Sequence, residues 1–143
     1  MPSPARRPGP TVAFPVPPTT AFDYLVDPRH RPEWQSSLSR VERVDGEVRV
    51  GQTWVDVTKP GPRPRMETTV LDRPRRWAER GTWRGFEAVL TLAFTETPSG
   101  CDVAATMRVS GRGAAALPAR ILDVLAPRAV LGDLRRAARA LRP

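Results

Sequence analysis

The chain has 143 residues, with Cys101 as its one cysteine and His30 as its one histidine, so an internal disulfide and a Cys/His zinc cluster are excluded. A Ser/His/Asp site would have to use His30. The formal net charge is +8, but residues 1–9 carry +2 and residues 112–143 carry +5, which leaves about +1 for the body between them. Because no basic strand with interleaved aromatic residues accompanies this charge, we expect no specific nucleic-acid partner.

The first ten residues are rich in proline and form the only stretch of low complexity, so we predict a disordered tail over 1–10 and one domain over 11–143. The tail lacks the apolar core of a signal peptide. No apolar run approaches the roughly 20 residues needed to cross a bilayer. A soluble, cytoplasmic protein is therefore expected, and the near-exclusive use of arginine over lysine is typical of a GC-rich bacterial genome.

The sequence of residues 11–34 predicts one strand followed by two short helices. Residues 11–16 have β-type composition, and Thr19 or Thr20 can cap a helix whose apolar positions fall at i, i+3 and i+4. Asp27-Pro28 ends this helix, because the residue before proline is disfavoured in the α region. Pro28 can open a second helix that ends near Trp34.

A run of strands follows, each bounded by turn residues. In the last two strands every second residue is apolar, which indicates an antiparallel sheet with one buried face. A short Pro-Ser-Gly turn joins these two strands as a hairpin. The predicted strands cover residues 37–44, 52–59, 66–71, 76–83, 86–95 and 101–109.

Residues 117–141 have the composition of a long helix, with the arginines largely away from its apolar stripe. We expect Pro127 to kink or break this helix near Leu125 and Ala126. The predicted apolar stripe consists of Ile121, Leu125, Leu131, Leu134, Ala138 and Leu141.

Four segments together resemble a known family: residues 12–34, the Val50-Gly51-Gln52-Thr53 turn, the Asp72-Arg73-Pro74 turn and the terminal helix. They are similar to the polyketide cyclase/dehydrase-like branch of the START/Bet v 1 (SRPBCC) superfamily, over about residues 12–141. The resemblance implies an α+β helix-grip fold, in which a curved seven-stranded antiparallel sheet wraps a long C-terminal helix in β-α-α-β6-α order. The gap between sheet and helix becomes a cavity suited to a small molecule.

The resemblance leaves three functions open. The first is binding of a hydrophobic molecule of polyketide, lipid or isoprenoid type, with no cofactor and no metal. The second is a polyketide cyclase, aromatase or dehydratase that uses acid–base chemistry without a cofactor; such enzymes are thought to use an arginine among other polar groups. The third is a membrane-surface or macromolecular adaptor that uses the arginine-rich terminal helix. The strand over 66–71 offers no inward arginine, which argues against the second function.

For ligand contact we predict tryptophans and the inward apolar positions of the strands and helix, with Trp34 at the mouth of the cavity. Trp54 shares a strand face with Asp56 and is expected to face solvent or a partner. The candidates for acid–base chemistry are Glu79 and His30, although neighbouring arginines favour surface positions for both. The predicted ligand-binding residues are Trp34, Trp77, Trp83, Phe86, Leu90, Leu92, Val103, Ala105, Met107 and Leu125.

Overall fold

The computed structural model describes residues 9–143, so most of the tail predicted over 1–10 lies outside the described residues. The elements follow the expected order, with each boundary within a few residues of its prediction. They are β1 (Thr11–Phe14), α1 (Pro18–Val26), the 3₁₀ turn η1 (Pro28–His30), α2 (Arg31–Trp34), β2 (Leu38–Glu42), β3 (Thr53–Thr58), β4 (Arg65–Asp72), β5 (Arg76–Trp83), β6 (Phe86–Thr97), β7 (Gly100–Gly111), the 3₁₀ turn η2 (Gly113–Ala115) and α3 (Ala116–Ala140).

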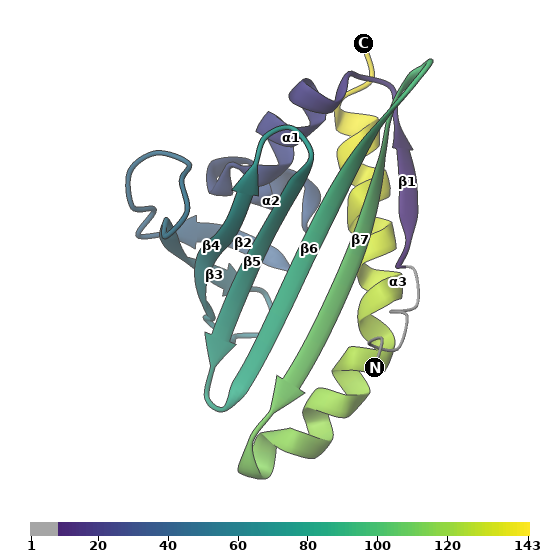
Figure 1. Cartoon of the computed structure of the whole chain (residues 1–143). Helices are drawn as coiled ribbons and strands as arrows, with labels where there is room; N and C mark the ends of the chain where they lie inside the picture. The colour runs from purple at the N-terminus through teal and green to yellow at the C-terminus, as the bar shows by residue number, and fades with distance from the viewer. Residues whose placement is uncertain (1–8) are drawn as a thin grey trace, which may run out of the picture.

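The seven strands form one antiparallel sheet in the order β1-β7-β6-β5-β4-β3-β2. Figure 1 shows the long strands β5, β6 and β7 side by side, the shorter strands β2 and β3 curving behind them, and α3 running along the sheet. Helix α3 packs mainly against β7 and β1, while α2 packs against α3 and β2. The α+β helix-grip fold is therefore confirmed.

The alternation in β6 and β7 does set which side chains face inward. Leu90 pairs with Met107 and Leu92 with Ala105 across the hairpin, and these side chains share the face that is turned toward α3. Gly100 follows the hairpin turn with φ +154°, and a Cβ there would lie 2.0 Å from the carbonyl oxygen of Phe14. Glycine is thus required where β1 and its exit pass closest to the hairpin.

The first helix begins one residue earlier than its predicted caps. Pro17 occupies the N-cap position of α1 and Pro18 its first turn, and no side chain caps it, so the prediction that Thr19 or Thr20 would do so is wrong. Proline fits here because its fixed φ suits the first helical turn, where its missing N–H is not needed. In η1, by contrast, the Asp27 carboxylate accepts a hydrogen bond from the Arg29 backbone N–H at 3.0 Å.

Helix α3 continues through Pro127 without a break, and Figure 1 shows its first turns running obliquely to the rest. Its fully buried residues are Ala119 near its start and Leu134 and Ala137 in its second half. Ile121 and Leu125 are 58% and 53% exposed, so assigning them to the buried stripe was wrong. The earlier turns of α3 also reach the sheet, since the Asp123 carboxylate accepts a hydrogen bond from the Val109 backbone N–H of β7 at 2.7 Å.

Within residues 9–143, no helix is both long enough and apolar enough to cross a membrane.

Candidate ligand-binding cavity

A cavity of about 420 Å³ lies between the sheet and α3. Most of its wall is apolar, and its polar residues come from α2, the strands and α3. The wall consists of Arg31, Trp34, Gln35, Ser37, Leu38, Asp56, Thr58, Pro60, Pro62, Pro64, Met66, Glu79, Gly81, Thr82, Trp83, Phe86, Ala88, Leu90, Met107, Val109, Leu122, Ala126, Ala129, Val130, Asp133 and Leu134. This size and composition are typical of small-molecule sites.

Strand register explains which inward residues reach the cavity. Glu79, Leu90 and Met107 form one row across β5, β6 and β7, and all three line the cavity. The row Trp77, Leu92 and Ala105 lies two residues further along the strands and belongs to the hydrophobic core. Helix α1 covers that end of the sheet, where the Phe22 and Phe94 rings lie 5.1 Å apart.

The cavity opens beside the β5–β6 turn. Arg84 and Gly85 occupy this two-residue turn with φ of +44° and +83°, values that suit the right-handed twist of a hairpin. Trp83 and Phe86 flank the turn with stacked rings 5.9 Å apart, and both line the cavity while remaining partly exposed. Leu122 of α3 also lines it and is 49% exposed. Lining residues that reach solvent mark the mouth.

Only some of the predicted ligand-contact residues line the cavity. The cavity wall includes Trp34, Trp83, Phe86, Leu90 and Met107. Trp34 is only 2% exposed, so its predicted place at the mouth is wrong, and Trp83 is the tryptophan found there. The remaining predicted residues do not line the cavity: Trp77, Leu92, Val103 and Ala105 are buried in the core, and Leu125 is exposed on α3.

The polar residues of the cavity centre on Arg31, which was not among the residues predicted for the site. Arg31 is 2% exposed and lies three residues before Trp34, so the short helix α2 directs both side chains inward. Its guanidinium binds two carboxylates at once. Nε and Nη2 donate to Asp56 at 3.2 and 2.8 Å, and Nη1 and Nη2 donate to Glu79 at 2.7 and 3.2 Å. We call Arg31, Asp56 and Glu79 the buried polar cluster.

Trp54 belongs to the support of this cluster. Its indole Nε1 donates to Asp56 Oδ1 at 2.9 Å, and the Arg31 guanidinium lies 5.2 Å from its ring centre. Alternation put Trp54 and Asp56 on one face as predicted, but that face is the buried one. The expectation of an outward Trp54 was wrong because the partner of the acidic residue is a buried arginine and not water.

Burial and neighbouring charges both shift the pKa values of the buried polar cluster. Burial alone would lower the Arg31 pKa, but the charges of Asp56 and Glu79 outweigh it and hold that pKa above its usual value. For Glu79, burial is the larger cause and the Asp56 charge adds to it, so its pKa is raised to about 7 despite the Arg31 partner. Glu79 is thus buried, against the surface position expected for it, and can exchange a proton near neutral pH.

Asp133 brings a further carboxylate to the cavity from α3. Its Oδ1 accepts hydrogen bonds from the backbone N–H and the hydroxyl of Ser36 at 3.2 and 3.1 Å. Burial raises the pKa of Asp133, although the Ser36 bonds and the Arg136 charge act in the opposite direction. These two hydrogen bonds join α3 to the segment after α2 at the cavity wall.

The other acid–base candidate, His30, lies outside the cavity. Its ring stacks on Tyr24 with centroids 5.0 Å apart, and its Nδ1 is 3.0 Å from the Tyr24 carbonyl oxygen. Among residues 9–143, no three His, Cys, Asp or Glu side chains are grouped in a way that could hold a metal ion.

Sequence reasoning missed Arg31 and Asp133 as cavity residues, and it expected Asp56 on the strand face of Trp54 to point to solvent or a partner. A signal for Arg31 was present, since a residue three positions before a buried tryptophan shares its helix face. The prediction of no inward arginine on β4 holds, because Arg65 is exposed. The arginine comes instead from a helix that is distant in sequence from the strands it meets.

Comparison with protein families gives a match over residues 10–143 to the family described as polyketide cyclase/dehydrase and lipid transport. A comparison with curated protein sequences gave no significant match.

Several solved structures share the fold at low sequence identity. Protein MLL2253 from Mesorhizobium loti is 17% identical with a TM-score of 0.71, covering 92% of this chain and 93% of that one. Ara h 8.0201 is 15% identical with a TM-score of 0.69, covering 92% of this chain and 93% of that one. The di-domain ARO/CYC StfQ from the steffimycin biosynthetic pathway is 17% identical with a TM-score of 0.72, covering 91% of this chain but 48% of that one.

A match over nearly the whole chain, in agreement with the helix-grip fold, places this protein in the polyketide cyclase/dehydrase and lipid transport family.

Proposed function

We propose that this protein binds an apolar or aromatic small molecule, of polyketide, lipid or isoprenoid type, in the cavity between the sheet and α3. The observation that carries the proposal is the cavity itself, about 420 Å³ in volume and lined mostly by apolar side chains. An apolar ligand would gain about 25 cal/mol for each Å² of apolar surface removed from water. The family description, which includes lipid transport, supports the same function.

Filling the cavity from its wall tests the proposal. Ala88 of β6 lines the cavity, so Ala88→Phe places a ring where the ligand would lie. Ala93 of the same strand is exposed on the outer face, which makes Ala93→Phe a matched control. We expect an apolar fluorescent probe to bind the wild type and Ala93→Phe saturably and to lose most of its affinity for Ala88→Phe.

Circular dichroism of all three proteins would confirm that they are folded, since overpacking a core costs about 1–3 kcal/mol. Equal binding by all three would show that the probe lies elsewhere, and no saturable binding by any apolar probe would end the proposal.

A second candidate function is cofactor-independent cyclase chemistry, and the buried polar cluster is the observation that favours it. Such an enzyme needs at least two polar side chains inside its cavity, and Arg31, Asp56 and Glu79 converge there. Glu79 would take the proton from carbon or oxygen of a poly-β-ketone, since its pKa of about 7 suits a general base.

Incubation with a synthetic poly-β-ketone tests this second function. The wild type should give an aromatic product, and Glu79→Gln should give at least tenfold less of it. Product formation at the uncatalysed rate by both proteins would exclude this function.

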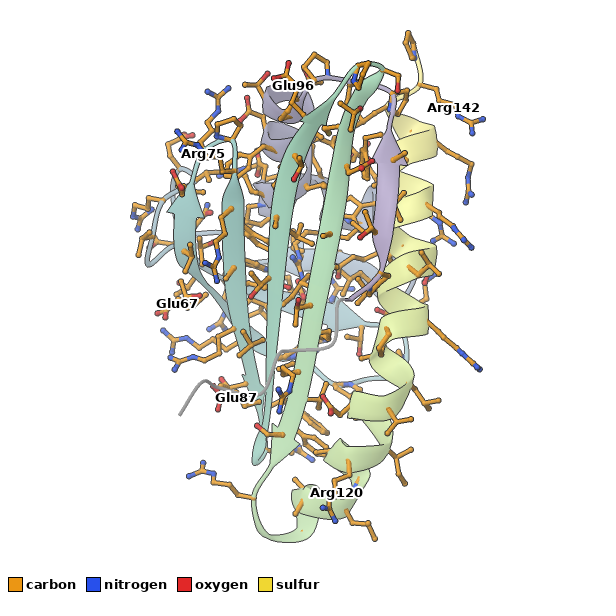
Figure 2. The ribbon with its side chains drawn as sticks, turned by 45° about the vertical axis from the view of Figure 1, so that its right-hand side comes forward. Glu67, Arg75, Glu87, Glu96, Arg120 and Arg142 are labelled. Atoms are coloured by element: carbon orange, nitrogen blue, oxygen red, sulfur yellow. The ribbon has the colours of Figure 1, made fainter. Side chains whose placement is uncertain are left out.

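The adaptor function has less support. It required a filled interior, whereas the structure holds a cavity. The arginine-rich end of the chain lies away from the mouth, since Figure 2 shows Arg142 at the opposite end of the molecule from Glu87, which follows the β5–β6 turn.

A further inference from the structure

We propose that the cavity selects apolar or aromatic molecules whose polar end donates hydrogen bonds, such as alcohols and phenols, and rejects those that end in a carboxylate. The inference rests on the proposed ligand-binding function and names the chemical class of its ligand. It follows from the charges and the free hydrogen-bonding positions of the cavity wall.

The charge balance of the wall is negative. Its charged residues are Arg31, Asp56, Glu79 and Asp133, three acids against one base. A ligand carboxylate would add a fourth negative charge in a site of low dielectric, where like charges repel far more strongly than in water. A neutral or donating group meets no such repulsion.

The single arginine does not offset this balance, because the protein itself occupies its donors. Arg31 donates through Nε, Nη1 and Nη2 to both carboxylates, and Nη2 also reaches Gln35 Oε1 at 3.2 Å. A guanidinium has five N–H donors in a fixed fork, and two bidentate carboxylates take up most of them. A ligand carboxylate could bind Arg31 only by displacing Asp56 or Glu79, which would leave a buried charge unpaired.

Acceptor positions, by contrast, remain free. Each carboxylate oxygen can accept two hydrogen bonds, and each Glu79 oxygen accepts one, from Arg31. Asp133 accepts both of its bonds from Ser36 through Oδ1, which leaves Oδ2 without a protein donor among residues 9–143. The wall therefore offers carboxylate oxygens to a ligand that can donate.

The free acceptors distinguish a hydroxyl from a carboxylate on the ligand. A hydroxyl group can donate a hydrogen bond to a carboxylate oxygen, whereas an ionised carboxylate can only accept. The free acceptors of the wall thus favour a hydroxyl.

Three matched naphthalenes test the selection by isothermal titration near pH 8: 2-naphthol, 2-naphthoate and naphthalene. We expect 2-naphthol to bind at least tenfold more tightly than 2-naphthoate, a difference of about 1.4 kcal/mol. Equal affinities, or tighter binding of 2-naphthoate, would overturn the inference. If all three molecules bind alike, ligand binding stands and the selection fails; if none of the three binds, the proposed function fails as well.

Substitutions test whether the buried charges cause the preference for 2-naphthol over 2-naphthoate. Glu79→Gln removes one negative charge while keeping an oxygen that can accept from Arg31, so the preference for 2-naphthol should shrink by threefold or more. Glu67→Gln is the matched control, because Glu67 lies on the neighbouring strand with its side chain 40% exposed and, in Figure 2, directed outward at the margin of the sheet. An unchanged preference in Glu79→Gln would contradict the inference. Asp133→Asn, which removes a charge from α3 instead, gives the same test should Glu79→Gln fail to fold.

Discussion

Arg31 illustrates how far burial changes the weight of a single ion pair. Replacing it with methionine would leave the Asp56 and Glu79 carboxylates buried without their partner, which destabilises proteins by about 3–5 kcal/mol. The surface pair of Arg73 and Asp23 is as short, at 2.7 Å, but both side chains are more than half exposed. We therefore expect Arg31→Met to lower the free energy of unfolding by several kcal/mol and Arg73→Met to lower it far less, because solvent screens the exposed pair.

Urea denaturation of both variants measures this difference. Equal losses of stability would show that the buried polar cluster is not held together by Arg31.

Glu79 gives a second prediction at the residue scale, a dependence of stability on pH. Its pKa is raised by burial to about 7 in the folded state, so the folded protein binds this proton more tightly than the unfolded chain does. The stabilisation is therefore full below the unfolded pKa, near 4.5, and is lost as the pH rises through about 7. At about 1.4 kcal/mol per pKa unit, a shift from 4.5 to about 7 limits this loss to about 3–4 kcal/mol.

The measurement is the free energy of unfolding of wild type and Glu79→Gln between pH 5 and 8. The difference between the two proteins isolates Glu79 from the other carboxylates, and we expect the wild type to lose stability relative to the variant as the pH rises. A constant difference would mean that the Glu79 pKa is not raised by folding.

At the scale of an element, α3 combines two functions in one continuous helix. Leu134 and Ala137 in its later turns are fully buried in the core, and residues from Leu122 to Leu134 border the cavity, whereas Ile121 is exposed. Leu134→Ala should then lower stability by about 2–5 kcal/mol, as buried leucines do, while Ile121→Ala should change it by about 0.5 kcal/mol or less. Thermal denaturation of the two variants compares the halves of α3; a large effect of Ile121→Ala would indicate that this half is covered in solution.

At the scale of the whole molecule, charge and cavity occupy different regions. Arg135, Arg136, Arg139 and Arg142 are exposed near the C-terminal end of α3, while the body of the chain is nearly neutral. A few clustered arginines release few counterions, so we predict only weak association with DNA or RNA that does not depend on sequence and disappears near physiological salt. Fluorescence anisotropy with several labelled oligonucleotides at low and physiological salt tests this, and tight sequence-dependent binding at the higher salt would contradict it.

The sequence by itself determined the order of the elements and the inward faces of β6 and β7, because strict alternation and turn residues act over a few neighbouring positions. It did not determine how far along those faces the cavity extends. Leu90 and Leu92 are equivalent in the pattern, yet only Leu90 lines the cavity, since α1 covers the row of Leu92.

The tertiary structure alone decided where the charges lie. Arg31 lies on a helix, 25 residues from Asp56 and 48 residues from Glu79, which lie on two strands. Its spacing from Trp34 indicates a shared helix face, but nothing in its own segment indicates which carboxylates it meets. A buried charge is tolerated only when a partner of opposite sign meets it, and the meeting of these three depends on how α2 packs over the curved sheet. Local pattern carries no information about such a meeting, which is why the polar centre of the cavity appeared only in the folded structure.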